Sequence, residues 1–225
     1  MKKIGLLVAM EKEAQGIIQG FSNVFTEQYK GKSFTIGKIG DKEVVLALAG
    51  IGKVNATYAT TLMIERYSVD CIINTGIAGG VGKLKPLTAL SVSSVCQHDS
   101  NTTALGDPIG LISGLNKVYF DCDEEIVEVI KKAAGEAQVG RVATGDKFVA
   151  SNVESKLISQ IFNAVACDME CGACAQVCYI AGVRFGALKV ISDSAGDDSP
   201  MAYEELAYRA CEINARTLLK AVTML

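Results

Sequence analysis

The sequence predicts an α/β protein with a three-layer α/β/α architecture around a mixed, mostly parallel central sheet. Three observations predict this class. Strand-like and helix-like segments alternate almost throughout the 225 residues, some strand-like segments are continuous apolar runs typical of strands buried on both faces, and no stretch has the composition of a linker. Apolar residues make up 49% of the chain and charged residues 21%, which is enough apolar material for one large core. We therefore expect a single domain over residues 1–225.

The beginning of the chain predicts a strand, a helix and a hairpin. Residues 3–10 form a continuous apolar run, which is interpreted as a strand buried on both faces. Residues 11–20 carry helix formers and end on glycine, as helices commonly do. Residues 33–39 and 42–49 flank a Gly-Asp pair at 40–41, which predicts a tight turn between two antiparallel strands.

A helix and a short strand come next. Residues 53–67 keep a helical period. The positions that keep this period are Val54, Thr57, Thr61 and Ile64. Residues 70–74 form a short apolar run, which predicts a buried strand. Residues 76–80 read Gly-Ile-Ala-Gly-Gly and are interpreted as a glycine-rich turn after this strand.

The middle of the chain contains one long segment without a period. Residues 89–96 mix Ser and Val and predict a strand. Residues 97–114 are rich in Asn, Asp, Pro and Gly, which predicts a long loop of the kind that often carries function. Residues 124–137 then predict a helix, residues 140–144 a strand and residues 152–162 a second helix.

The remaining residues continue the alternation. Residues 164–167 predict a strand, residues 170–181 a helix that contains several cysteines, and residues 185–192 another strand. Residues 194–202 are polar and predict a loop. Residues 203–224 keep an amphipathic period, which predicts a long closing helix.

Four of the eight cysteines have a spacing that resembles a metal-binding cluster. They are Cys167, Cys171, Cys174 and Cys178. Their offsets of 0, 4, 7 and 11 follow one face of a helix, on which they would span about 16 Å. Sulfur atoms bound to one zinc ion lie within about 4 Å of each other, so one ion cannot bind all four. We therefore expect buried, reduced cysteines and neither a metal nor a cofactor.

Charge and hydropathy exclude two classes of partner. The net charge is −3, and only 5 of the 22 basic residues are scattered arginines, so no basic stripe is present to bind nucleic acid. Uncharged stretches such as residues 171–183 are shorter than the roughly 18 apolar residues of a membrane span. The apolar run at residues 4–10 is too short for a signal peptide and is followed by Glu11, Lys12 and Glu13. We expect a cytoplasmic protein.

Acidic residues follow several of the predicted strands. They are Glu11, Glu13, Asp168, Glu170 and Asp193. Ligands of such sheets bind beyond the carboxyl ends of the strands, and paired carboxylates suit acid–base chemistry on a substrate with a cationic transition state. Each residue also has an ordinary explanation, since acidic residues stabilise the first turn of a helix or cap a turn. His98 is the only histidine, and we interpret it as structural.

Six blocks in order along the chain resemble one known family. They are Ile4-Gly5 with Ala9-Met10-Glu11-Lys12-Glu13, Gly50-Ile51-Gly52-Lys53-Val54-Asn55, residues 73–80, residues 144–149, Asp168-Met169-Glu170, and Ile191-Ser192-Asp193. With these blocks the sequence resembles the 5′-methylthioadenosine/S-adenosylhomocysteine nucleosidases of the nucleoside phosphorylase superfamily. The resemblance covers essentially the whole chain. It implies the fold of that superfamily, a small-molecule nucleoside substrate, no cofactor, a homodimer and a place in methionine salvage.

The resemblance also implies roles for individual residues. Glu13 would be the general base that activates water, and Asp193 the general acid that protonates or hydrogen-bonds purine N7. Glu170 would bind the ribose hydroxyls, Phe148 would stack on adenine, and the Val149 backbone would bind the edge of the base. Further substrate-binding residues would be Met10, Ile51, Ile77, Gly79, Met169 beneath the sugar, Ser192 and Tyr203. Carboxylates suit this reaction because they stabilise oxocarbenium charge and because adenine leaves more readily when it is protonated.

The residues leave several alternatives open. Phosphorolysis needs cationic groups to hold phosphate, and the sequence has no arginine before Arg66, which favours water as the nucleophile. Ile77 stands where the family often has serine. Thr102, Leu105 and Asp107 stand at positions that the family usually fills with apolar or aromatic residues around the 5′ group, so the preferred 5′ substituent stays open. The alternatives are a futalosine-type nucleoside or deoxyadenosine as substrate, phosphorolysis, and a non-catalytic nucleoside-binding protein.

Overall fold

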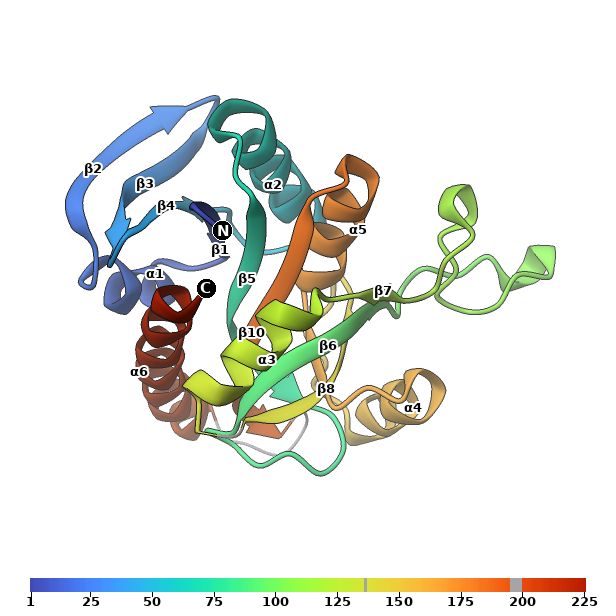
Figure 1. The fold of residues 1–225 in the computed structure, drawn as a ribbon. Coiled ribbons are helices and arrows are strands. Elements are labelled where there is room, and N and C mark those ends of the chain that lie inside the picture. The colour runs from blue at the N-terminus through green and yellow to red at the C-terminus, as the bar shows by residue number, and fades with distance from the viewer. Residues whose placement is uncertain (136, 195–199) are drawn as a thin grey trace.

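The computed structural model describes residues 1–135, 137–194 and 200–225. Its strands are β1 (Lys3–Val8), β2 (Ser22–Tyr29), β3 (Lys32–Ile39), β4 (Lys42–Leu48), β5 (Cys71–Gly80), β6 (Ala89–Gln97), β7 (Phe120–Asp121), β8 (Gln138–Thr144), β9 (Ala166–Asp168) and β10 (Arg184–Ser194). Its helices are α1 (Glu11–Ile18), α2 (Lys53–Tyr67), α3 (Glu124–Ala133), α4 (Asn152–Phe162), α5 (Cys171–Ala181) and α6 (Pro200–Met224). The predicted alternation of strands and helices is confirmed (Figure 1).

The strands form one mixed sheet that partly closes on itself. Its order is β10-β6-β8-β9-β5-β1-β4-β3-β2, and β10 also pairs with β5, so that β5, β10, β6, β8 and β9 form a ring. Among the described residues, five pairings are parallel and five are antiparallel. The sheet is mixed as predicted, but "mostly parallel" was wrong. The β2–β3–β4 meander and the antiparallel pairs β10–β6, β5–β9 and β6–β7 account for the difference.

Five of the six helices that the structure describes, all except α4, form two groups on the outside of the sheet. Helices α1 and α3 both pack against α6, and α2 packs against α5 (Figure 1). Strand β1 is buried on both faces as predicted, because Leu7 belongs to the apolar core beneath α2 and α5 while Leu6 belongs to the core beneath α1 and α6. The arrangement in three distinct layers stays a prediction, since part of the sheet is a ring.

Strand β2 was missed by the sequence analysis. It is the last strand of the sheet order, and most of its side chains are exposed, including Phe25 at 57%. An exposed edge strand therefore lacks the apolar pattern on which a prediction depends. The strand forms because Lys30 and Gly31 both have positive φ angles, of 46° and 76°, which close a tight turn onto β3.

The glycine-rich segment 76–80 is part of a strand, not the turn that the sequence predicted. Strand β5 continues to Gly80, because it pairs with β10 along this segment and with β9 at Gly79 and Gly80. Glycine has a low intrinsic preference for strands, so only the neighbouring strands reveal this extension. The consequence is that β5 runs directly beneath the candidate site described below.

Several predicted boundaries and one helix face also differ. The predicted period of residues 53–67 ran through Val54, Thr57, Thr61 and Ile64, but the first three are exposed. Helix α2 instead buries Ala56, Ala59, Thr60, Leu62 and Met63. Helix α3 ends at Ala133 rather than at residue 137. The predicted loop at 97–114 contains a 3₁₀ turn, Thr103–Leu105, and overlaps a second, Ser113–Leu115. Of the predicted loop at 194–202, residues 195–199 lie outside the described residues, and α6 already begins at Pro200.

The cysteine helix forms, but one of its four expected members lies elsewhere. Cys171, Cys174 and Cys178 are buried on α5. Cys167 lies in β9, opposite Gly79, so the assumption that it continues the helical face was wrong. Burial raises the pKa of Cys174 to about 12, which keeps this thiol protonated near neutral pH.

Within the described residues, no helix combines the length and the apolarity that crossing a bilayer requires.

Candidate active site

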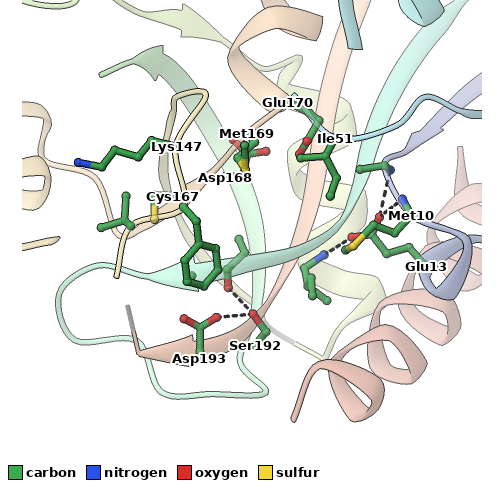
Figure 2. A pocket seen from close by; sticks show the side chains of 16 residues that line it. Met10, Glu13, Ile51, Lys147, Cys167, Asp168, Met169, Glu170, Ser192 and Asp193 are labelled. Carbon is green, nitrogen blue, oxygen red and sulfur yellow. Dashed lines mark hydrogen bonds between the residues drawn. The ribbon is translucent and has the colours of Figure 1, made fainter. Parts of the chain in front are cut away.

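A pocket opens at the carboxyl ends of several strands. Its hollow measures about 670 Å³, a value that includes the open mouth. The residues that line it are Ala9, Met10, Glu13, Ile51, Ile77, Ala78, Gly79, Lys147, Phe148, Val149, Cys167, Asp168, Met169, Glu170, Ser192 and Asp193. Figure 2 shows Glu13 and Asp193 on opposite sides of this pocket, with Glu170 on a third. Three carboxyl groups from three parts of the chain therefore face one space.

Glu13 is buried and held by three backbone amides. Its Oε2 accepts hydrogen bonds from the N–H groups of Ala9 at 3.0 Å and Met10 at 2.9 Å, and its Oε1 accepts one from Ile77 at 3.0 Å (Figure 2). The bond from Met10 also satisfies the amide at the start of α1. Glu13 therefore caps the helix and lines the pocket at the same time. A carboxylate oxygen can accept two hydrogen bonds, which leaves Oε1 with capacity for one more donor.

The strand beneath Glu13 must approach it very closely. A Cβ atom at Gly76 would lie 2.3 Å from Oε1 of Glu13, and the φ angle of Gly76 is +148°. Only glycine fits at this position, which explains one glycine of the segment 76–80. Burial raises the pKa of Glu13, and this effect outweighs the attraction of Lys189 and the three backbone hydrogen bonds, which lower it.

Asp193 lies near the end of β10, at a local irregularity of the sheet. The pairing with β5 shifts register between Ile191 and Asp193, so that Asp193 faces Gly79. The Oγ of Ser192 lies 2.5 Å from Oδ1 of Asp193 and 3.3 Å from the carbonyl oxygen of Ala78 (Figure 2). The register shift turns both neighbouring polar side chains to the pocket, which a regular strand would not do.

Glu170 stands at the start of α5 and contacts a distant turn. Its Oε1 accepts a hydrogen bond from the N–H of Gly52 at 2.8 Å, and the preceding Met169 also lines the pocket. Burial and the nearby charge of Asp168 raise the pKa of Glu170. They outweigh Lys189 and the hydrogen bond from Gly52, which lower it, so the pKa lies above its ordinary value. This carboxyl is therefore buried, oriented and available to hydroxyl donors.

The segment after β8 forms a further wall of the pocket. Val149 is buried, whereas Phe148 is 62% exposed and lines the pocket. Lys147 lines it too, but its Nζ lies 2.8 Å from the carboxylate of Glu154, an ion pair on the outer side of the protein. An exposed aromatic face beside a buried apolar side chain suits a planar, aromatic ligand.

A buried ion pair beneath the pocket was missed by the sequence analysis. Lys189 Nζ lies 2.7 Å from Oδ2 of Asp168, and both side chains are 2% exposed. Asp168 also accepts hydrogen bonds from Thr144 Oγ1 at 2.6 Å and from the Cys171 N–H at 3.0 Å. Burial lowers the pKa of Lys189, but the attraction of Asp168 and Glu170 outweighs it and the pKa is raised. The sequence does contain a sign of this ion pair. Lys189 lies inside the apolar strand predicted at 185–192, and buried lysines are rare unless they are paired.

We expect Lys189→Met to destabilise the protein by about 3–5 kcal/mol, because it leaves the carboxylate of Asp168 buried without its cation. The free energy of unfolding, measured by denaturant titration, tests this. The double variant Lys189→Met with Asp168→Asn removes both charges and should recover part of the loss. Equal stability of Lys189→Met and the native protein would contradict the pairing.

The predicted site residues with described side chains lie around the one pocket. They are Met10, Glu13, Ile51, Ile77, Gly79, Phe148, Val149, Met169, Glu170, Ser192 and Asp193. Tyr203 lies on α6, and its side chain is outside the described residues. Asp168, which the sequence grouped with these acidic residues, also lines the pocket. Cys167 and Lys147 line it too and were not among the predicted site residues. Glu11 is exposed on α1 and is not part of the lining, so grouping it with the site carboxylates was wrong.

The loop residues that depart from the family pattern do not line this pocket. Asp107 accepts hydrogen bonds from Thr102 Oγ1 at 2.7 Å and from Ser113 Oγ at 3.2 Å. Leu105 is 83% exposed. Figure 1 shows the segment before β7 extending away from the body of the protein. His98, at the start of this segment, packs against Gly145 and is not part of the lining.

Comparison with known proteins gives a consistent result. The family model described as the phosphorylase superfamily matches residues 3–223. The 5′-methylthioadenosine/S-adenosylhomocysteine nucleosidase of Shewanella halifaxensis is 37% identical over 215 residues, which cover 92% of this chain and 93% of that relative. The enzyme of the same description from Neisseria meningitidis, solved with methylthio-immucillin-A, has a TM-score of 0.94 and 33% identity and covers all of both chains. Futalosine hydrolase of Helicobacter pylori has a TM-score of 0.94 and 30% identity and covers 100% of this chain and 98% of its own. The chain belongs to the phosphorylase superfamily and, within it, to the 5′-methylthioadenosine/S-adenosylhomocysteine nucleosidase family.

Proposed function

We propose that this protein hydrolyses the N-glycosidic bond of 5′-methylthioadenosine, S-adenosylhomocysteine or both, and releases adenine and the thioribose. The observation that carries the proposal is the convergence of Glu13, Glu170 and Asp193 on one pocket, in which each residue is at most 7% exposed. Cleavage of this bond develops positive charge on the ribose, which buried carboxylates stabilise. The names of the relatives agree with this reaction.

In the proposed mechanism Glu13 is the general base. Its Oε1, which accepts one backbone hydrogen bond, would take the proton of a water molecule that attacks the anomeric carbon. Glu170 would accept hydrogen bonds from the ribose hydroxyls, and Met169 would lie beneath the sugar. Ile77 offers its backbone N–H to Glu13 but no side-chain hydroxyl, so the water would be held by Glu13 without help from that side chain.

Asp193 would act at the other end of the reacting bond. It would donate a proton or a hydrogen bond to purine N7, so that adenine leaves as a neutral molecule. Phe148 would stack on the base, and the Val149 backbone would bind its edge. Met10, Ile51, Gly79, Ser192 and Tyr203 would complete the binding surface.

Hydrolysis suits the site better than phosphorolysis. No arginine is among the lining residues that the structure describes, and both nearby lysines are engaged, Lys189 with Asp168 and Lys147 with Glu154. A bound phosphate needs cationic or amide donors to offset its charge. Three buried carboxylates would instead repel it.

The decisive experiment measures free adenine released from a substrate panel, with and without phosphate. We expect release from 5′-methylthioadenosine or S-adenosylhomocysteine at a rate that phosphate does not change. Release only with phosphate would support phosphorolysis, and preferential cleavage of futalosine would support the activity of the Helicobacter relative. Tight binding of the panel without any cleavage would identify a nucleoside-binding protein instead.

We further propose a cytoplasmic homodimer whose interface flanks the pocket mouth. Large apolar side chains are exposed on the two helices that begin beside the pocket, Val54 at 80% on α2 and Val153 at 69% on α4. Leu105 is exposed on the extended loop. All eight cysteines are unpaired, as is typical of a reducing compartment.

The dimer predicts a mass in solution of twice that of one chain, measured by sedimentation equilibrium at micromolar concentration. We expect Val54→Glu to shift the protein towards monomers, because it introduces a charge into an apolar interface. A monomeric native protein, or a Val54→Glu variant that stays dimeric, would contradict an interface at this helix.

A further inference from the structure

An ion pair joins Lys53 and Asp99, two residues that do not themselves line the pocket. Lys53 Nζ lies 2.7 Å from Oδ1 of Asp99, and the side chains are 22% and 28% exposed. The same ammonium group donates a hydrogen bond to Oε1 of Gln97 at 3.2 Å. Lys53 begins α2, and Asp99 follows β6, so the pair spans 46 residues of sequence.

A third segment closes these contacts into a cycle. The backbone N–H of Lys53 donates to Oδ1 of Asp146 at 2.7 Å, and the backbone N–H of Asp146 donates to Oδ2 of Asp99 at 2.9 Å. We call Lys53, Asp99 and Asp146 the rim triad. Burial raises the pKa of Asp99, but the hydrogen bonds from Lys53 and Asp146 outweigh it and hold this pKa below its usual value. Asp99 is therefore ionised at neutral pH.

The close approach of α2 to Asp146 also depends on the backbone. A Cβ atom at Gly52 would lie 3.0 Å from Oδ1 of Asp146, and the φ angle of Gly52 is +100°. The carboxylate of Asp146 thus satisfies an amide at the start of a helix from a remote part of the chain. Such charge-assisted bonds are stronger than bonds between neutral groups.

Each end of the rim triad adjoins a wall of the pocket. Directly before Lys53 come Ile51, which lines the pocket, and Gly52, whose N–H orients Glu170. Directly after Asp146 come Lys147 and the segment with Phe148. Figure 2 shows Ile51 and Glu170 on one side of the pocket and Lys147 on another. The triad thus bridges the wall that would hold the sugar and the wall that would hold the base.

We infer that Lys53, Asp99 and Asp146 are positioning residues that fix the separation of the base-binding and ribose-binding walls for nucleoside binding. This inference rests on the proposed function of the pocket. Loosening the triad lets the two walls move relative to each other. A ligand that contacts both walls then loses affinity, whereas a ligand that contacts only one wall does not.

The test compares two ligands in the full-length protein by calorimetry. Methylthio-immucillin-A, the nucleoside analogue in the structure of the Neisseria relative, would contact both walls, and adenine would contact the base wall alone. We expect Lys53→Met to weaken the analogue by about tenfold and adenine by less than about threefold. Lys53→Arg should restore most of the affinity because it retains the charge, and Asp99→Asn should resemble Lys53→Met.

A matched control and a salt series complete the experiment. Lys3→Met breaks an exposed ion pair with Glu43 at the first residue of β1, the end of that strand away from the pocket, and should leave both affinities unchanged. Since 5′-methylthioadenosine is uncharged, salt acts on its KM through the protein, and we expect its KM to rise with salt in the native protein but not in Lys53→Met. Equal losses for both ligands, or none for the analogue, would overturn the positioning role. A native protein that binds neither ligand would overturn the proposed function together with it.

Discussion

Glu13→Gln is expected to lower kcat for 5′-methylthioadenosine by about a thousandfold while the variant still binds the nucleoside. Glutamine keeps the shape of the side chain but cannot accept a proton from water. The measurement is kcat from adenine release, together with the dissociation constant of methylthio-immucillin-A. A variant with near-native kcat would remove Glu13 from the mechanism.

The surroundings of Glu13 require a check on folding. Both carboxylate oxygens accept backbone N–H groups, Oε2 from Ala9 and Met10 and Oε1 from Ile77. The amide NH₂ of glutamine must therefore face at least one backbone donor, and a lost hydrogen bond of this kind costs about 1–3 kcal/mol. A melting curve separates this effect from the loss of the base. Asp41→Asn, in the exposed turn before β4, serves as a control that changes charge far from the pocket.

The pH dependence of the native protein follows from the same environment. Burial raises the pKa of Glu13 above its ordinary value of 4.5. A general base acts only when it is ionised, so kcat/KM should fall as the pH drops through this raised pKa. Lys189 lowers the pKa of Glu13, so removing its charge in Lys189→Met should move the acidic limb of the profile to higher pH.

The sequence was most informative where a pattern was both long and partly buried. The predicted bounds of residues 53–67 and 152–162 coincide with α2 and α4, although α2 buries a different face from the predicted one. It was least informative where pairing with other strands decides the structure, as in β2, whose side chains are mostly exposed, and in the glycine-rich end of β5. The closure of the sheet through β5 and β10 depends on contacts between distant segments and has no local signal.

The candidate site followed from the sequence by two routes of different strength. The position of acidic residues after strands predicted that five of them would gather at one edge of the sheet. Glu13, Asp168, Glu170 and Asp193 line one pocket, whereas Glu11 does not. Their individual roles came only from the family resemblance and stay predictions. Lys189 was missed because a single lysine in an apolar strand does not identify its partner. The rim triad was missed because it joins residues that are 46 and 93 positions apart.

Asp193→Asn is expected to lower the rate of adenine formation by about a thousandfold, because asparagine cannot transfer the proton that the leaving base requires. The structure gives the reason for an effect on chemistry rather than on folding. Ser192 Oγ, 2.5 Å from Oδ1 of Asp193, can equally donate its hydrogen bond to the amide oxygen of asparagine. Single-turnover adenine formation and a melting curve measure the two effects separately. Persistent activity, or simple unfolding of the variant, would contradict the assignment.

A change of leaving group distinguishes the acid from the base. A 4-nitrophenyl 5-methylthioriboside keeps the sugar but releases a stable phenolate, so its cleavage needs no proton from Asp193. Asp193→Asn should therefore cleave this substrate within about tenfold of the native rate, whereas Glu13→Gln should be slow with both substrates, because attack by water still needs the base. Ser192→Ala removes the hydroxyl beside Asp193 but keeps the carboxyl, and it should lose less activity than Asp193→Asn. If Asp193→Asn lost equal activity with both substrates, Asp193 would act on the sugar or on the fold, and not as the acid that protonates adenine.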